Sequence, residues 1–213
     1  MPKATWWNLP ASKRRRVVEA AMVEFGERGF SAGSLNVIAR EAQIAKGSVF
    51  QYFEDKLDLF ATICEWVSEE AIKAIFEGID HWDDQPYFAL MRKLFVNWIH
   101  YFRDYPLPRG IAMAVKNEMD AEVRATVRSV TNTHYVDVLL PLAKRAIDRG
   151  EFRPRTSAAQ VVAMSVLLFR HLDEAPFYPH IDPVLGLYEK TSKEVDRIAL
   201  DLVAALERAY AKP

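Results

Sequence analysis

Only one of the 213 residues is a cysteine, Cys64, so no disulfide can form within the chain. A lone thiol fits a reducing compartment, and we expect it to be an inert buried side chain rather than a redox switch. Long apolar runs are missing too. The longest, Val161 to Phe169, contains Ser165 and is far shorter than the roughly 20 residues that span a bilayer. The first 16 residues lack the apolar segment of a signal peptide. We therefore expect a cytoplasmic protein with no membrane partner.

A large excess of charge of one sign is also absent. The net charge is −1 at pH 7, which argues against a protein that coats nucleic acid over its whole surface. The charge is unevenly divided, however. Residues 1–56 carry nine Lys and Arg against six Asp and Glu, whereas residues 57–213 carry 19 against 23. A mildly basic segment ahead of a mildly acidic one suits local contact with a polyanion.

The residue patterns of common catalytic and metal centres are missing as well. The five histidines are scattered without the spacing of metal ligands. There is no glycine-rich phosphate loop and no nucleophile elbow, and no paired acid and base stand out. We therefore predict that the chain is not an enzyme and that it needs no metal or cofactor.

What the sequence does contain is apolar residues at helical spacing along nearly its whole length, with no alternation long enough for a strand. This pattern predicts an all-α protein of about nine helices. We expect a helix-turn-helix head of three helices over residues 1–56 and a larger helical bundle over residues 57–213. The helices expected after the head are 56–79, 86–102, 108–117, 121–149 with a kink at Pro141, 157–172 and 192–211.

The most informative segment is residues 13–56. Val17, Ala21 and Phe25 form an apolar stripe on the first helix, and Gly29 stands where a helix end needs a residue that accepts positive φ. Ser34 is the expected N-cap of a short helix over 35–41, and another helix follows after a turn of at most four residues. Two short helices this close, packed on a longer one, can place a helix end in the major groove of DNA.

These residues resemble the TetR family of bacterial transcriptional regulators. Residues 17–30 match the family's first helix, 38–44 its second helix and turn, 46–53 its recognition helix and 56–59 the start of its fourth helix. The resemblance implies a DNA-binding head and a body that binds a small molecule and forms a homodimer. The rest of the chain is similar to the family in helical content and length alone.

The resemblance also implies where DNA is contacted. Two of these positions begin the second helix, three lie on the first turn of the recognition helix, and two match phosphate contacts farther along. They are Ser34, Asn36, Lys46, Gly47, Ser48, Tyr52 and Lys56. The side chains suit these roles, because lysine donates to phosphate or guanine, serine and asparagine both donate and accept, and a tyrosine hydroxyl reaches phosphate.

Three residues depart from the family pattern. Gln43 occupies a turn position that usually holds glycine, so either it adopts a strained left-handed conformation or the turn is rebuilt. Ala45 replaces the usual serine or threonine cap of the recognition helix, and Phe50 replaces a common phosphate-binding tyrosine. The basic run at residues 13–16 is either a solvated helix start or a flexible arm near phosphate or the minor groove.

The body carries two further predictions. The helix over 157–172 is too apolar to face water on any side, and the last helix has an apolar stripe. A helix-turn-helix head that reads the major groove needs a second half-site for affinity, so we expect a two-fold homodimer. The resemblance implies that it forms through these last two helices. The predicted interface residues are Val195, Ile198, Leu202, Val203 and Leu206.

Aromatic and polar residues are interleaved in the middle helices, as in a pocket inside a helical bundle. This composition favours an apolar or aromatic effector, although surface edges or satisfied core groups would give the same pattern. The predicted ligand-binding residues are Trp98, Tyr101, Met113, Asn117, His134 and Tyr135.

Together these patterns predict a ligand-responsive regulator, more often a repressor than an activator, that binds a pseudo-palindromic double-stranded operator as a homodimer. One alternative is a TetR-like protein-interaction module that has lost DNA binding, which Gln43, Ala45 and Phe50 favour and Lys46, Tyr52 and Lys56 oppose. The other is an α-helical enzyme that uses a cavity in the body.

Overall fold

The computed structural model describes residues 1–213, with the side chain of His134 left out. Within this range the regular elements are all helical, and the β contacts amount to one isolated bridge between Phe152 and Ala211. The predicted all-α fold is confirmed. None of the described helices is long and apolar enough to cross a membrane.

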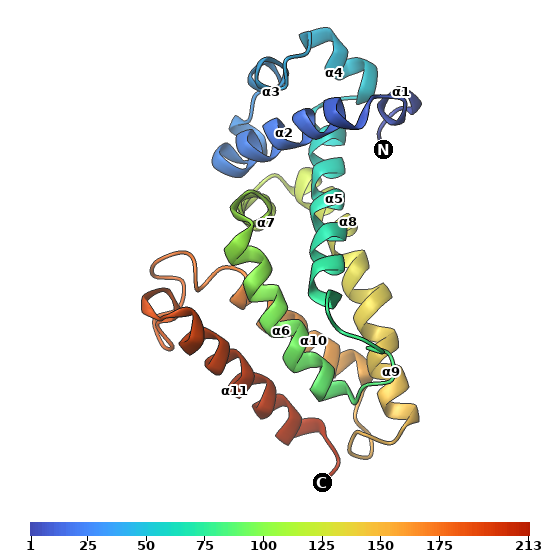
Figure 1. The fold of residues 1–213 in the computed structure, drawn as a ribbon, viewed down its shortest axis with the longest axis vertical. Helices are drawn as coiled ribbons and strands as arrows, with labels where there is room; N and C mark the ends of the chain where they lie inside the picture. Colours follow the sequence, from blue (N-terminus) through green and yellow to red (C-terminus); the bar gives the residue numbers. More distant parts are fainter. The chain divides into compact units, whose positions relative to one another are not determined.

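The α-helices follow one another along the chain, with short connections in the N-terminal part and longer loops before α6, α10 and α11 (Figure 1). They are α1 Ala4–Trp7, α2 Ala11–Ala32, α3 Leu35–Glu41, α4 Lys46–Tyr52, α5 Lys56–Phe76, α6 Tyr87–Asp104, α7 Pro106–Asn117, α8 Ala121–His134, α9 Leu140–Asp148, α10 Ala158–Leu172 and α11 Ser192–Tyr210. A π-helical turn η1, Tyr135–Leu139, joins α8 to α9, and a short 3₁₀ turn η2, Leu187–Glu189, precedes α11. Counting α8, η1 and α9 as one kinked helix and leaving out the four-residue α1, the described chain has nine helices, as predicted.

The kink expected at Pro141 takes the form of η1, which comes directly before α9. Proline has no N–H to donate to the carbonyl one turn earlier, and its ring crowds that carbonyl. A π-helical turn relieves the crowding by widening the helix there without ending it. Both glycines expected at helix ends have the predicted positive φ, 69° at Gly29 and 72° at Gly150, but α2 kinks at Gly29 and continues to Ala32. Several boundaries differ by two or three residues from the prediction, because α5 ends at Phe76 rather than at residue 79, α6 ends at Asp104 rather than at 102, and α7 begins at Pro106 rather than at 108.

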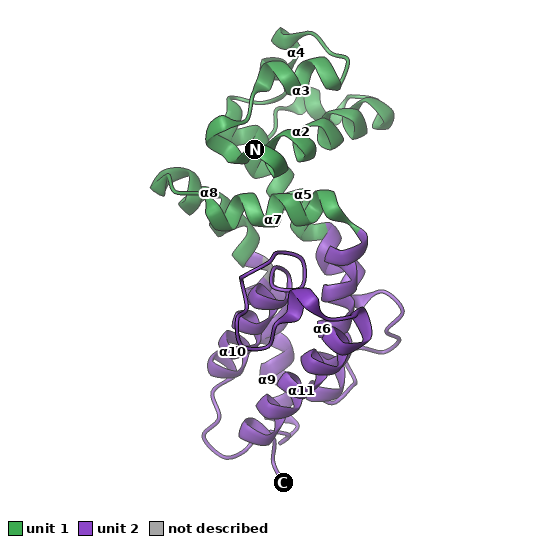
Figure 2. Ribbon diagram, turned by 90° about the vertical axis from the view of Figure 1, so that its left-hand side faces the viewer, with its two compact units in different colours: residues 1–69, 105–132 green, residues 70–104, 133–213 purple. Residues whose placement is uncertain are grey.

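The chain forms two compact units, coloured separately in Figure 2. The first unit contains Met1–Glu69 and Tyr105–Asn132, and the second contains Glu70–Asp104 and Thr133–Pro213. Residues 105–132 therefore group with the N-terminal helices, a long-range association that the order of helices along the chain does not indicate. The functional boundary predicted at residue 56 stays a prediction.

The core of the first unit is built on α2, whose Phe25 is fully buried and lies 4.9 Å, between ring centroids, from Phe60 of α5. On another face α2 crosses α7 so closely that a Cβ added at Gly26 would come within 3.3 Å of the Gly110 backbone. Cys64 is also buried here, and burial raises the pKa of its thiol well above the usual value. The thiol therefore stays protonated, which agrees with the inert role expected for it.

The core of the second unit centres on Phe95 of α6 and Phe169 of α10, whose rings stack with centroids 3.9 Å apart. The indole N–H of Trp98 donates to the Phe169 carbonyl at 2.9 Å, so the polar group of this buried side chain is satisfied. α11 packs along α6 and begins with a capping box between Thr191 and Glu194.

Candidate nucleic-acid interface

The predicted helix-turn-helix is formed by α3 and α4, with a turn over residues 42–45 between them. Gln43 adopts the left-handed conformation, with φ of 56°, at the residue after the C-cap of α3. Its N–H donates to the Arg40 carbonyl at 3.0 Å, and the Ile44 N–H donates to the Ala39 carbonyl at 2.9 Å. This pair of bonds is a Schellman motif. The turn therefore keeps the left-handed backbone conformation that usually requires glycine, and Gln43 adopts it at a cost in conformational free energy.

The first turn of α4 is open. Ala45 is the N-cap, with φ −65° and ψ 141°, and its methyl side chain cannot accept a hydrogen bond from the helix. The first N–H groups of a helix have no carbonyl one turn earlier to bond. In α4 the Ser48 N–H donates to the Ala45 carbonyl at 2.9 Å, which leaves the N–H groups of Lys46 and Gly47 for an external acceptor at the positive end of the helix dipole.

Replacing Ala45 with Ser should stabilise the first unit by about 1 kcal/mol, because the N-cap backbone is already in the extended conformation from which a serine oxygen reaches the N2 or N3 N–H. Urea unfolding of the full chain measures the change. Ala11→Ser, at the exposed first position inside α2, is the control and should not stabilise. An unchanged or lower stability for Ala45→Ser would contradict the uncapped start of α4.

The residues predicted to contact DNA on the first turn of α4 are accessible. Lys46 and Gly47 are exposed, Ser48 is half-buried, and no hydrogen bond or ion pair of the Lys46 side chain is found within the described chain. On α3, Asn36 is exposed and Ser34 is half-buried. These five positions keep the accessibility that their predicted roles require, and the roles themselves stay predictions.

Ser34 is the N-cap of α3, as predicted, but its side chain makes no capping hydrogen bond. Its backbone N–H instead donates to Oε1 of Glu24 at 2.9 Å. Glu24 is only 5% exposed on α2, and Arg28 lies 3.6 Å from its other oxygen. A buried carboxylate from the preceding helix thus holds the start of α3, a link between distant positions that the local N-cap pattern could not reveal.

Tyr52 and Lys56, the predicted phosphate contacts, already have structural partners. The Tyr52 side chain is 6% exposed, and its ring lies 6.1 Å from that of Trp6. The Lys56 ammonium donates to the carbonyls of Ser31 and Gly33, both at 3.2 Å, and lies 4.4 Å from the Phe30 ring centroid. Lys56 therefore caps the C-terminal end of α2, and it would have to leave these partners to hold a phosphate.

The C-terminal end of α4 is bound by the segment that we call the N-terminal clamp, residues 3–7. The Lys3 N–H donates to the Tyr52 carbonyl at 2.8 Å, and the Lys3 ammonium donates to the Phe50 carbonyl at 2.9 Å. The Thr5 hydroxyl donates to the Gln51 carbonyl between them. Three consecutive carbonyls at the end of α4, which a helix leaves unpaired, are thereby satisfied.

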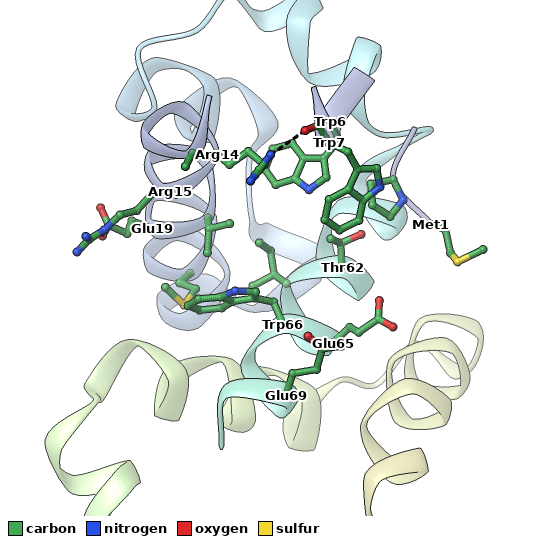
Figure 3. Close-up of a pocket in the computed structure, with 15 residues that line it drawn as sticks. Met1, Trp6, Trp7, Arg14, Arg15, Glu19, Thr62, Glu65, Trp66 and Glu69 are labelled. Carbon is green, nitrogen blue, oxygen red and sulfur yellow. Dashed lines mark hydrogen bonds and ion pairs between the residues drawn. The ribbon is translucent and has the colours of Figure 1, made fainter. Parts of the chain in front are cut away.

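Packing and a second set of hydrogen bonds hold the clamp in place. Trp6 is 3% exposed, and its ring lies 4.8 Å from that of Phe53. Arg14 donates to the carbonyls of Trp7 and Leu9 at 2.8 and 2.9 Å, the first of which is drawn in Figure 3. The basic run is therefore not a flexible arm, since α2 begins at Ala11 and includes it. The pair of tryptophans ahead of this run was the one signal of the clamp in the sequence.

Residues 17–63 match the sequence model of a family described as bacterial regulatory proteins, tetR family. The N-terminal helices belong to the TetR family. Among curated proteins, the "Probable acrEF/envCD operon repressor" of Escherichia coli K12 is 28% identical over 103 residues, which cover 46% of this chain and 44% of that protein. The match thus spans less than half the length of this relative.

Solved TetR-family structures share the fold over nearly the whole chain. A TetR-family regulator from Chloroflexus aurantiacus aligns over 100% of both chains with a TM-score of 0.65 and 23% identity. FadR of Bacillus subtilis, in complex with stearoyl-CoA, aligns over 89% of this chain and 96% of its own, with a TM-score of 0.72 and 14% identity. At these identities the likeness shows the fold of the TetR body and nothing about its ligand.

The residues predicted to line a ligand pocket are divided between the two units. Trp98 and Tyr101 are 6% and 7% exposed in the second unit, whereas Met113, 7% exposed, and Asn117, which is exposed, belong to the first. His134 was also predicted to line the pocket, but its side chain is outside what the structure describes. Tyr135 lies in η1, and burial raises the pKa of its hydroxyl, assisted by Asp173. A shared pocket stays a prediction.

Most of the apolar stripe of α11 is buried within the single chain. Val195, Val203 and Leu206 are at most 8% exposed, whereas Ile198 and Leu202 are half-buried. In a single chain α10 leaves Met164 and Leu167 39% and 62% exposed, so the prediction that this helix faces no water depends on a partner copy and stays a prediction. If a partner copy packs on α10 and α11, the half-buried α11 residues and the exposed face of α10 are the surfaces that remain for it.

Proposed function

We propose that this chain is a sequence-specific DNA-binding transcriptional regulator of the TetR kind that acts as a homodimer and responds to a small molecule. The observation that carries the proposal is the open first turn of α4. An uncapped helix start with an exposed lysine, on the second helix of a helix-turn-helix, suits entry into the major groove of DNA.

The side chains around this turn divide into two roles. Lys46 supplies a positive charge for phosphate or a guanine edge, while Ser48 and Asn36 can donate to and accept from base edges. The clamp bonds the Tyr52 carbonyl at the end of α4, and Glu24 accepts from the Ser34 N–H at the start of α3. Lys56 caps the end of α2 through the Gly33 carbonyl. A rigid pair of helices loses little freedom when it binds, which supports a DNA-reading role.

Two further parts of the proposal draw on the relatives. The similar Escherichia coli protein is named a repressor, so repression of an operator is the expected mode. The FadR neighbour is in complex with stearoyl-CoA, a ligand with a long apolar chain. The proposal of an apolar or aromatic effector rests on this ligand and on the number of aromatic residues in the second unit, of which Trp98 and Phe169 pack against each other.

Gel-shift titration of the full chain against DNA flanking its own gene, at two salt concentrations, tests the proposal. Lys46→Ala should weaken operator binding and reduce the slope of log affinity against log salt by about one unit, since one phosphate contact is lost. If Lys46 instead reads a guanine, discrimination at one base pair should fall by about 1–3 kcal/mol. Lys144→Ala, an exposed lysine on α9, is the matched control and should change neither quantity.

The alternative functions make different predictions in the same assay. A TetR-like protein that acts through another protein would show only weak, sequence-independent binding that Lys46→Ala and Ser48→Ala leave unchanged. That outcome would overturn the DNA-binding proposal. The comparisons indicate no catalytic family, and a catalytic role is not part of the proposal.

A further inference from the structure

A groove of about 930 Å³ lies within the first unit, between the N-terminal clamp, α2 and α5 (Figure 3). All of its lining residues fall within residues 1–69, so it is separate from the predicted effector residues around Trp98. Ligand pockets of small molecules usually have volumes of about 300–1,000 Å³, so the groove is large enough for one. Neither the DNA-contact prediction nor the effector prediction uses it.

The groove is lined by aromatic rings from two elements. Trp6 and Trp7 of the clamp lie on one side and Trp66 of α5 on the other, as Figure 3 shows. Trp7 and Trp66 are 63% and 39% exposed, which is unusual for tryptophan in a protein of this size. Val18 and Met22 of α2 add apolar surface between them.

The charges around the groove are not balanced. Glu65 and Glu69 lie one turn apart on α5, on either side of Trp66 in the sequence, and both are exposed. No cationic partner of either carboxylate is found in the described part of the chain. Among the other charged groups of the lining, Arg15 pairs with Glu19 at 2.7 Å and the N-terminal ammonium of Met1 with Asp58 at 2.6 Å. Arg14 donates to two neutral carbonyls of the clamp and keeps its positive charge, so the two glutamates leave the groove with an excess of negative charge.

We propose that this groove is a binding site for an organic cation with an aromatic or apolar body. Tryptophan faces attract a cation through the negative charge of the ring face, and tryptophan is the strongest of the aromatic residues in this respect. Two carboxylates without partners supply the complementary charge, and Val18, Met22 and the rings cover the apolar body. A neutral apolar ligand would leave both carboxylates beside an apolar surface, and an anion would be repelled by them.

Isothermal titration calorimetry of the full chain with tetraphenylphosphonium tests the site. Tetraphenylborate has nearly the same shape and the opposite charge, so the pair isolates the charge preference. We expect one tetraphenylphosphonium per chain, bound at least about tenfold more tightly than tetraphenylborate, a preference that weakens as salt is added. Equal binding of the two ions, or tighter binding of the borate, would overturn the proposal.

Substitutions of groove residues test whether the ligand binds in the groove. Glu65→Gln and Glu69→Gln together should weaken tetraphenylphosphonium binding about tenfold, whereas Glu27→Gln, an exposed carboxylate on α2 outside the groove, should leave it unchanged. Trp7→Ala should weaken binding of both ions, and because this side chain is largely exposed the fold should persist. Binding that is indifferent to the glutamate pair and to Trp7 would place the ligand elsewhere and overturn the proposal. The test uses no DNA, so its outcome is independent of the proposed regulatory function.

Discussion

Trp6→Ala should destabilise the first unit by about 3 kcal/mol, a large effect for a residue so near the start of a chain. Trp6 is 3% exposed and contacts the rings of both Phe53 and Tyr52. Its removal leaves a cavity beside α4. It also frees the clamp, so that the Lys3 and Thr5 bonds to the last carbonyls of α4 are lost with it.

The same substitution should reduce operator affinity by about tenfold in the proposed function, because DNA would then have to order the end of α4 as it binds. Hydrogen exchange shows whether the loss of order is confined to the first unit and includes α4. The amides of α4 should exchange faster in Trp6→Ala than in the unchanged protein, while those of α10 in the second unit keep their protection.

Trp7→Ala is the matched control, since the Trp7 side chain is 63% exposed and makes no ring contact with Tyr52 or Phe53 in the described structure. It should change stability by no more than about 0.5 kcal/mol, as expected for surface positions. If the two tryptophan variants unfold at the same urea concentration, the clamp contributes nothing to α4 and the inference from its contacts fails.

The clamp also illustrates what the sequence could not predict. The helices of the head follow from local signals, such as the stripe of Val17, Ala21 and Phe25 and the glycine at position 29, and these predictions are confirmed. The clamp has no periodic pattern, and two of its hydrogen bonds come from ordinary polar side chains, Lys3 and Thr5, that reach backbone carbonyls almost 50 residues away. Nothing in residue identity marks such a partner.

Lys56 shows the same ambiguity for a single side chain. An ammonium group donates equally well to a phosphate oxygen and to a carbonyl, so the sequence alone could not distinguish a DNA contact from a helix cap. The structure provides the carbonyls of Ser31 and Gly33. Lys46, by contrast, is accessible and has no partner among the side chains that the structure describes, so substituting it tests DNA binding more directly.

Periodicity has a similar limit in α11. A stripe of apolar residues at helical spacing shows that one face is buried, but it does not show whether the covering surface belongs to the same chain or to another copy. Val195 and Val203 are buried within the chain, whereas Leu167 is the most exposed of the large apolar side chains on α10. The homodimer that we propose therefore needs a test on α10 as well as on α11.

Leu167→Glu should convert the dimer into monomers. Leu167 is 62% exposed in a single chain, so a glutamate there costs little in an isolated protomer. At an apolar contact between two copies, the same carboxylate would be buried without a partner, which costs several kcal/mol at each of the two symmetric positions. Light scattering at micromolar concentration should give twice the chain mass of 24.4 kDa for the unchanged protein and the chain mass itself for Leu167→Glu.

Two comparisons make this result specific. Val184→Glu, at an exposed valine in the loop before η2, introduces the same charge and should leave the dimer intact. Val203→Glu, at a fully buried position of α11, should instead unfold the second unit, which circular dichroism separates from clean dissociation. Operator affinity of Leu167→Glu should fall by about a hundredfold or more, because each half-site would then bind one head without the gain from linking two. An unchanged protein that is already monomeric at micromolar concentration, or a Leu167→Glu variant that stays dimeric, would exclude α10 as the contact between copies.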